Sequence, residues 1–251
     1  MPKRARTVAD PEQELAALRE ELEHQRAENA VKERQLDRYA ADLRATSRRE
    51  RQRARELAET YMATVRALAG AVEARDAYTA HHADRVTAYG MELAAARGLD
   101  LAEQFELECA FLLHDIGKVA IPDGILFKAG SLDAREREVM ERHPVIGEEI
   151  ISEIPFLETA RPLVRHHHER WDGGGYPDGL GGEEIPLVAR VFALADALDA
   201  LTSDRPYRAA VGIAQARVEI ERSDGQFDPD VLDAFATISD ERIEDIRSRL
   251  S

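Results

Sequence analysis

Apolar residues recur every seven positions along the first part of the chain, between Leu15 and Leu57. The first core position of this repeat is occupied by Leu15, Leu22, Asn29, Leu36, Leu43, Glu50 and Leu57. The second core position holds Leu18 and Tyr39, but also two polar residues. A seven-residue repeat of this kind predicts a helix whose apolar seam pairs with another helix in a coiled coil.

Polar residues within the seam indicate which kind of coil to expect. Gln25 and Lys32 occupy the second core position and weaken the seam. Asn29 in the first core position is the kind of residue that fixes register and a two-stranded state. We therefore expect residues 1–58 to form a parallel homodimer. The alternative is a single solvated helix, because the apolar seam covers only some of its positions.

Beyond about residue 58 the pattern changes to shorter helical stretches, and strand signals are nearly absent. The predicted helices span residues 61–74, 78–96, 101–113, 134–142, 145–154, 156–168, 187–201, 213–223, 229–238 and 242–250. Asp133 followed by Glu136 resembles a capping box, and Gly98 and Gly130 stand where helices should end or loops turn. The sequence thus predicts an all-α domain at residues 59–251, preceded by a long coiled-coil helix at residues 1–58.

Composition and length favour a soluble, cytoplasmic protein. The 251 residues are enough for one domain with a full core and an appendage. No segment approaches the run of about 20 apolar residues that a membrane span needs, and no apolar segment follows the basic start, so we expect neither a span nor a secretory signal. The single cysteine, Cys109, lies in an apolar stretch and is expected to be a buried small hydrophobe, which suits a reducing compartment.

The net charge of -15 is unevenly distributed. Residues 61–251 carry 20 basic and 36 acidic side chains, so they would repel a nucleic acid polymer. An anionic substrate would need bound metal and a few local arginines. The one basic cluster is formed by Arg44, Arg48, Arg49, Arg51, Arg53 and Arg55. We interpret it as a solvated helix face, with a nucleic-acid or lipid contact as the alternative.

Histidines are concentrated in one part of the chain, because seven of the eight lie between His81 and His168. Crowded imidazoles are costly unless a cation holds them in the neutral form, and neutral imidazole and carboxylate groups suit divalent transition metals. The glycine-rich segment WDGGGYPDGLGGEE at residues 171–184 follows these histidines directly. Such a loop suggests a backbone that comes close to a ligand, with Trp171 as a packing anchor.

Three long motifs make the chain similar to a known family. They are LLHDIGK at residues 112–118, HHERWDGGGYP at 167–177 and ADALDALTSDRPYR at 195–208. The segments ARDAYTAHHADRV at 74–86, HPVIG at 143–147 and QFDP at 226–229 fit the same pattern in the same order. Residues 59–238 resemble the HD-GYP family of HD-superfamily metal-dependent phosphohydrolases. The resemblance implies a helical bundle with two metal ions, usually iron or manganese, that hydrolyses cyclic di-GMP.

The resemblance also assigns roles to single residues. The implied metal ligands are His82, His114, Asp115, His143, His167, His168 and Asp196. Lys118 matches a lysine beside the reacting water or phosphate. The implied substrate-binding residues are Gly175, Tyr176, Pro177, Arg205 and Arg208. Arginine suits this role because its planar fork can donate two hydrogen bonds to phosphate, although ion pairing with the acidic surface is an equal alternative for both arginines.

Two cations that are about 3.5–4 Å apart can share one bridging water and lower its pKa. The resulting hydroxide can then attack the phosphorus of a 3'-5' phosphodiester. Asp115 is the natural bridge between them. Lys118 then stabilises the transition state or helps protonate the leaving oxygen, and both roles remain open.

Some positions depart from the family pattern or have a simpler explanation. His81 stands where the family often has glycine, so we expect a bystander, or an exchange of roles with His82. Tyr78 replaces a glutamate that helps some members to bind a third metal, which favours two ions. His166 is expected outside the direct ligands, and Asp199 is expected to hydrogen-bond backbone or a ligand histidine.

The leading functional hypothesis is a phosphodiesterase that opens cyclic di-GMP to the linear dinucleotide or onward to GMP. The alternatives are a weakly active or inactive nucleotide-binding scaffold and a hydrolase of another nucleotide. The coil leads into the first helix of the domain, so a change in its register can alter access to the metals. We expect the input to come through the coil or from an upstream sensory partner protein.

Overall fold

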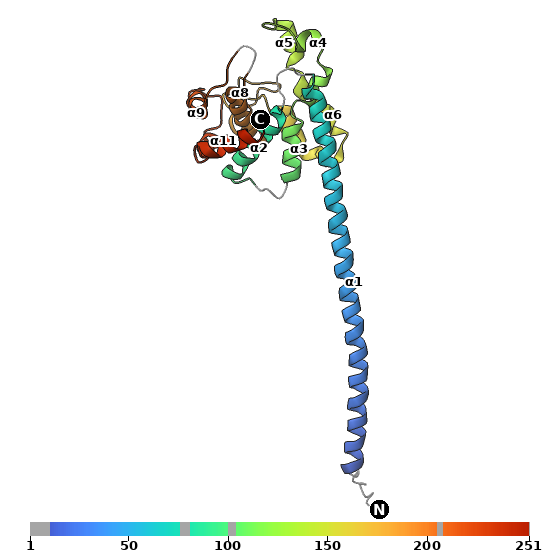
Figure 1. Ribbon diagram of the computed structural model, residues 1–251. Coiled ribbons are helices and arrows are strands. Elements are labelled where there is room, and N and C mark those ends of the chain that lie inside the picture. The colour runs from blue at the N-terminus through green and yellow to red at the C-terminus, as the bar shows by residue number, and fades with distance from the viewer. Residues whose placement is uncertain (1–10, 76–80, 100–103, 205–207, 251) are drawn as a thin grey trace, which may run out of the picture. The chain divides into compact units, whose positions relative to one another are not determined.

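The computed structural model describes residues 11–75, 81–99, 104–204 and 208–250 (Figure 1). Helices are the only regular elements in these residues, which confirms the predicted all-α class. No helix in the described ranges has both the length and the apolar character needed to cross a bilayer. The chain divides into two compact units between Ala58 and Glu59, and each unit is described separately.

The described helices follow one another in this order: α1 (Pro11–Glu73), α2 (His82–Arg97), α3 (Gln104–Leu112), η2 (Ile116–Ala120), α4 (Asp123–Leu126), α5 (Ala134–Met140), α6 (His143–Ser152), η3 (Pro155–Ala160), α7 (Arg161–His166), η4 (Gly182–Glu184), α8 (Leu187–Thr202), α9 (Ile213–Glu221), α10 (Pro229–Ala236) and α11 (Asp240–Arg249). Elements named η are short 3₁₀ helices.

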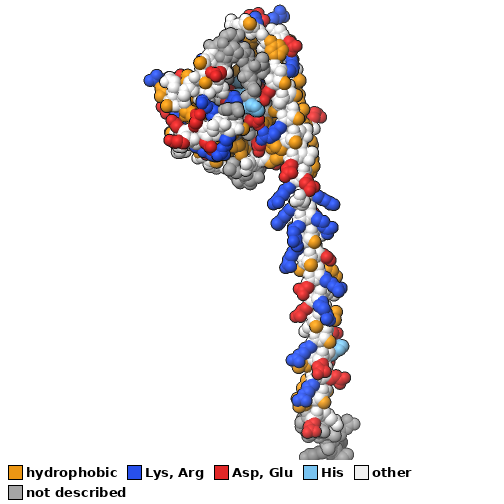
Figure 2. All heavy atoms as spheres, viewed as in Figure 1, with side chains coloured by type: hydrophobic (Ala, Val, Ile, Leu, Met, Phe, Trp, Pro, Cys, Tyr) orange, Lys and Arg blue, Asp and Glu red, His pale blue; other side chains and the backbone are white. Residues whose placement is uncertain are grey.

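Residues 11–58 belong to α1, and their seam residues lie at the surface. Leu36 is 66% exposed and Leu43 is 71% exposed. Along α1, Figure 2 shows small apolar patches among many basic and acidic side chains. The long helix that the heptad pattern predicts is therefore present. Its pairing with a second copy remains a prediction.

The core of residues 59–250 is built around α2 and α8, which pack against each other. Val86 and Leu93 of α2 and Phe192 and Leu198 of α8 are almost completely buried. Cys109 of α3 belongs to the same core, as the sequence predicted, and its burial raises the pKa of the thiol to about 12. This packing fixes the positions of the helix ends that carry the histidines and carboxylates of the sequence motifs.

Helix boundaries follow local sequence chemistry. Asp133 and Glu136 form the predicted capping box at the start of α5, and Gly98 ends α2 in a left-handed conformation. The predicted helix at 156–168 is instead two elements, η3 and α7, because Pro162 opens a new helix. Residues 61–74 do not form a separate helix, since α1 extends to Glu73.

The last turns of α1 hold two other segments in place. Glu73 Oε1 accepts a hydrogen bond from the backbone N–H of Ala83 at 2.6 Å, at the beginning of α2. Arg75 donates to the carbonyl oxygens of Val119 at 2.7 Å and Ile121 at 3.2 Å, at the end of η2. The end of α1 therefore connects the start of α2 with the turn after Asp115.

Candidate metal centre

Residues from five separate segments meet beside the core. His82 begins α2, His143 begins α6, and Asp196 lies within α8. The turn between α3 and η2 supplies His114 and Asp115, and the end of α7 supplies the two histidines that follow it. Each member of a subset of four can offer a ligand atom within 4.8 Å of the others; these are Asp115, His143, His167 and His168. The sequence-predicted residues thus come together.

Asp115 occupies the centre of this cluster. Its Oδ1 lies 3.1 Å from Nε2 of His143 and 3.7 Å from Nε2 of His167. Its Oδ2 lies 3.1 Å from Nε2 of His114 and 2.8 Å from Nζ of Lys118. The two carboxylate oxygens therefore face different partners, as a group that bridges two cations requires.

Local hydrogen bonds orient three of the imidazoles. Nδ1 of His114, His143 and His167 donates to the carbonyl oxygen of the residue three positions earlier, at 2.8, 2.8 and 2.9 Å respectively. This tautomer leaves a lone pair on each Nε2, which is the state that binds a metal.

The facing nitrogen atoms have no proton to share. Nε2 of His143 and Nε2 of His167 are 3.2 Å apart. Oδ1 of Asp115 is buried without a hydrogen-bond donor among the described residues. Three acceptors directed at one point repel one another unless a cation lies between them, so the residues present fit a bound metal.

His82 is oriented by a different partner. Its Nδ1 donates to Oδ2 of the buried Asp199 at 2.7 Å, and its Nε2 lies 3.5 Å from Oδ1 of Asp196. The expected contact between Asp199 and a candidate ligand histidine is confirmed. Arg85 donates to Oδ1 of Asp199 at 2.6 Å, a contact that the sequence analysis missed. Its only signal was an arginine one turn after His82.

The charges in the cluster favour metal-binding protonation states. Burial alone would raise the pKa of Asp115, but Lys118 and His114 hold this pKa well below its usual value. Burial lowers the pKa of His167 to about 4. Burial and the neighbouring histidines likewise lower the pKa of His168 well below its usual value. At pH 7 the carboxylate of Asp115 is therefore ionised, and the imidazoles of His167 and His168 are neutral. The pKa of His82 is raised instead, because its burial, which would lower it, is outweighed by Asp199 and Asp196.

Two other histidines lie away from the cluster. His81 is exposed, and its backbone has φ of 62°, a left-handed conformation that glycine adopts most readily. Nδ1 of His166 lies 3.5 Å from Oδ2 of Asp178 and 3.9 Å from Oε1 of Glu169, in a separate group. Both positions agree with the interpretation, favoured from the sequence, that these two histidines do not bind the metal ions directly.

A buried carboxylate organises the glycine-rich loop. Glu169 accepts hydrogen bonds from the backbone N–H groups of Asp178, Gly179 and Leu180, at 2.8, 3.1 and 3.1 Å. The sequence analysis did not single out Glu169, although its position directly after His168 in the loop motif was a signal. This residue closes the loop over the end of α7.

The loop brings Tyr176 against the cluster. The Tyr176 ring stacks on His168, with ring centroids 4.7 Å apart, and the peptide bond before Pro177 is cis. A side chain at Gly175 would come within 2.5 Å of Glu169 Cα and of the backbone nitrogen of Arg170. The absence of a side chain at this position is therefore required by the protein's own backbone.

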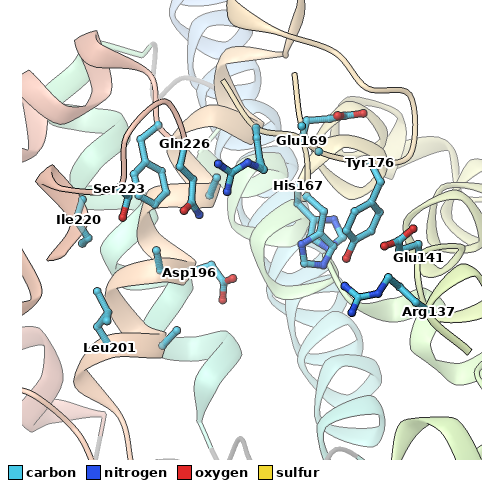
Figure 3. A pocket seen from close by; sticks show the side chains of 18 of the residues that line it. Arg137, Glu141, His167, Glu169, Tyr176, Asp196, Leu201, Ile220, Ser223 and Gln226 are labelled. Carbon is cyan, nitrogen blue, oxygen red and sulfur yellow. The ribbon is translucent and has the colours of Figure 1, made fainter. Parts of the chain in front are cut away.

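A cavity of about 710 Å³ opens beside the cluster. His167, His168, Tyr176 and Asp196 are among the residues that line it, and Figure 3 shows how the lining side chains surround it. Volumes of 300–1,000 Å³ are typical of small-molecule sites. Arg208 also lines the cavity and donates to the carbonyl oxygen of Ala200 at 2.6 Å. Arg205 and Tyr78, which the sequence analysis also named, lie outside the described residues.

Comparison with known proteins settles the family. The family model described as HD domain matches residues 41–231. The chain belongs to the HD-domain family. This family is metal-dependent, in agreement with the His/Asp cluster, and relatives named cyclic di-GMP phosphodiesterases confirm the resemblance that the motifs indicated.

Three curated relatives illustrate the similarity of this HD domain. The cyclic di-GMP phosphodiesterase response regulator RpfG of Xanthomonas campestris is 43% identical over 72% of this chain and 48% of its own length. A 3'3'-cGAMP-specific phosphodiesterase of Vibrio cholerae is 41% identical over 75% of this chain and 37% of its own length. A cyclic di-GMP phosphodiesterase of Thermotoga maritima is 40% identical over 70% of this chain and 49% of its own length. The chain thus spans half or less of the length of these relatives.

A solved structure supports the same fold. An HDG"Y"P protein of Bdellovibrio bacteriovorus superposes with a TM-score of 0.51 and 22% sequence identity, covering 67% of this chain and 52% of that one. At this level of identity, the similarity shows the helical HD fold alone.

Proposed function

We propose that the protein is a metal-dependent phosphodiesterase that hydrolyses cyclic di-GMP. The observation that carries this proposal is the convergence of imidazole Nε2 atoms on the ionised carboxylate of Asp115, beside a cavity large enough for a nucleotide. Relatives named cyclic di-GMP phosphodiesterases support the substrate class.

In this proposal, the ligands of two divalent cations, iron or manganese, are His82, His114, Asp115, His143, His167, His168 and Asp196. When bound, such cations supply an acidified water nucleophile and neutralise charge on the phosphate. Asp199 accepts a hydrogen bond from Nδ1 of His82 and so orients Nε2 of this ring toward the centre. Backbone carbonyl oxygens orient the rings of His114, His143 and His167 in the same way.

Lys118 supplies positive charge and a proton beside the reacting phosphate. Its Nζ is already 2.8 Å from Asp115, so it needs only a small side-chain movement to donate to a phosphate oxygen or to the leaving ribose oxygen. Tyr176, with Gly175 and Pro177, shields the cluster on one side, and Arg205 and Arg208 hold the substrate's phosphates.

The test is hydrolysis by the full chain. Protein loaded with iron under anaerobic conditions, or with manganese, is incubated with cyclic di-GMP, and the nucleotides are separated chromatographically. We expect linear dinucleotide or GMP to accumulate. An absence of product with both metals would contradict the proposal and favour a nucleotide-binding scaffold instead.

A second substrate is favoured by one observation, because a relative at 41% identity is named a 3'3'-cGAMP-specific phosphodiesterase. The same assay with 3'3'-cGAMP distinguishes the two. A ratio of the two kcat/KM values far from one identifies the preferred substrate.

We also propose that residues 15–57 form a parallel two-stranded coil between copies of the chain, in the cytoplasm, and that a sensory partner acts through it. The exposed leucines at heptad spacing support this assembly, since burying them favours association. Sedimentation of the full chain and of residues 58–251 measures the mass. A monomer in both cases would refute the coil.

A further inference from the structure

The cavity beside the cluster has two ends with different chemistry. Arg137 and Glu141 lie next to Tyr176 on one side, whereas Ser223 and Gln226 lie on the opposite side (Figure 3). Asp196 and His167 lie between the two ends in the same view. A cyclic dinucleotide whose phosphate reaches the cluster would therefore direct its bases toward these ends.

Arg137 and Glu141 face the cavity together. The backbone N–H of Glu141 donates to the carbonyl oxygen of Arg137 at 2.8 Å, so the two residues are one helical turn apart on the same face. Arg137 is exposed and Glu141 is half-buried. Within the described parts of the chain, neither side chain has an ion pair or a side-chain hydrogen bond, and the two do not pair with each other. Both are therefore available to a ligand.

Glu141 lies near the loop that borders the cluster. Figure 3 shows Glu141 beside Tyr176, and Tyr176 in turn stacks on His168. Glu141, Tyr176 and His168 also line the same cavity. A substrate held at the cluster therefore meets the carboxylate of Glu141 at this end of the cavity.

The combination of one guanidinium and one carboxylate selects the type of ligand. A phosphate next to Arg137 would be repelled by Glu141, whereas a base edge with both donors and acceptors satisfies the two groups. Guanine presents the N1–H and N2–H groups, which a carboxylate accepts, and the O6 and N7 acceptors, to which arginine donates. Adenine can offer the carboxylate only its N6–H₂ donor, because N1 is unprotonated and the 2-amino group is missing, so the two-donor contact that guanine makes is lost.

We propose that Arg137 and Glu141 form a guanine-reading site at one end of the cavity. The inference rests on the proposed function and adds base specificity to it. The opposite end is tolerant, because the amide of Gln226 can both donate and accept hydrogen bonds and so suits either purine. The protein therefore prefers cyclic dinucleotides with at least one guanine, and cyclic di-AMP is the poor ligand.

The test compares Glu141→Gln with the matched variant Glu138→Gln, whose side chain is exposed on the same helix and does not line the cavity. Kd values for slowly hydrolysed phosphorothioate analogues of cyclic di-GMP, 3'3'-cGAMP and cyclic di-AMP are measured by calorimetry with the metal-loaded full chain. Wild type and Glu138→Gln are expected to bind cyclic di-AMP roughly 5- to 150-fold more weakly than cyclic di-GMP, the range for a bidentate base contact. Glu141→Gln is expected to remove most of this difference.

The same preference is measured as kcat/KM with metal-loaded protein. Equal binding of cyclic di-GMP and cyclic di-AMP by wild type, an unchanged preference in Glu141→Gln, or no binding of any of the three would overturn the inference. Hydrolysis without the preference refutes the guanine site and leaves the proposed function intact. The opposite outcome is also possible to recognise. If the protein binds guanine-containing ligands selectively, loses this selectivity in Glu141→Gln and hydrolyses none of them, the proposed function is refuted and the guanine site stands.

Discussion

The histidines of the cluster are buried by their own chain, whereas the leucines of the heptad seam are exposed. His114 is 4% exposed and His143 is 1% exposed, but Leu36 and Leu43 are more than half exposed. Both regions are helical, so secondary structure does not distinguish them. The difference is that the cluster is assembled by contacts within residues 59–250, while the seam of residues 11–58 can be buried only by a partner. Metal binding and self-association should therefore be separable.

The largest effect should come from removing a cluster residue. In His114→Ala, hydrolysis of cyclic di-GMP is expected to fall by at least about 1,000-fold, because a bound cation stabilises the transition state by several kcal/mol. Turnover and metal content per chain are measured together. His24→Ala changes an exposed histidine of the seam region and serves as the control. Full activity in His114→Ala would contradict the metal assignment.

The second prediction concerns pH and the metal-free protein. Burial lowers the pKa of His167 to about 4, whereas an unfolded histidine titrates near 6.5. The unfolded chain therefore binds more protons between these values, and stability is lost as the pH falls through this window. From pH 7 to pH 5, the free energy of unfolding should fall by about 2 kcal/mol through this residue.

Urea unfolding at both pH values measures this loss. In His167→Gln the loss should be smaller by that amount, whereas His24→Ala should retain it, because His24 is exposed and lies outside the cluster. The same loss in all three proteins would show that His167 is not buried in its neutral form.

A smaller effect is expected from the carboxylate that closes the loop. Glu169→Gln replaces an acceptor of three backbone N–H groups by an amide with one acceptor oxygen, which should destabilise the protein by about 1–3 kcal/mol. KM for cyclic di-GMP should rise as Tyr176 loses its position. Glu183→Gln, an exposed change in the same loop, is the control. Identical unfolding curves for the two variants would refute this role.

The smallest effect should come from His81, an exposed histidine directly beside the buried His82. His81→Gly relieves a left-handed conformation but adds backbone freedom to the unfolded chain, so stability should change by less than about 1 kcal/mol. Metal content should stay unchanged, whereas His82→Ala should reduce it. Loss of metal in His81→Gly would show that burial does not decide which histidines bind.

Much of the fold was predictable because helical periodicity depends on neighbours in sequence. The pattern at residues 187–201 corresponds to α8, and the capping pair Asp133 and Glu136 marks the start of α5. The turn η2 was missed because five residues are too few to show a period. The division between η3 and α7 was missed, although Pro162 in the first turn of α7 was a signal for the start of a new helix.

The candidate site was predictable only as a set of residues. Motif order indicated that His82, His114 and His143 would meet, although they are far apart in sequence. It did not indicate which nitrogen of each ring faces the centre, since that depends on hydrogen bonds to the backbone and to Asp199. The role of Glu169 was hidden for the same reason, because its partners are backbone groups that every sequence has.

Three rings of the cluster are each aligned by a carbonyl group of their own segment rather than by a neighbouring ring. Folding has thus already fixed their rotamers, so a cation that enters does not have to restrict them, and less entropy is lost on coordination. Deleting one ring leaves the other two aligned. The centre should therefore lose affinity step by step as ligands are removed, instead of collapsing as a unit.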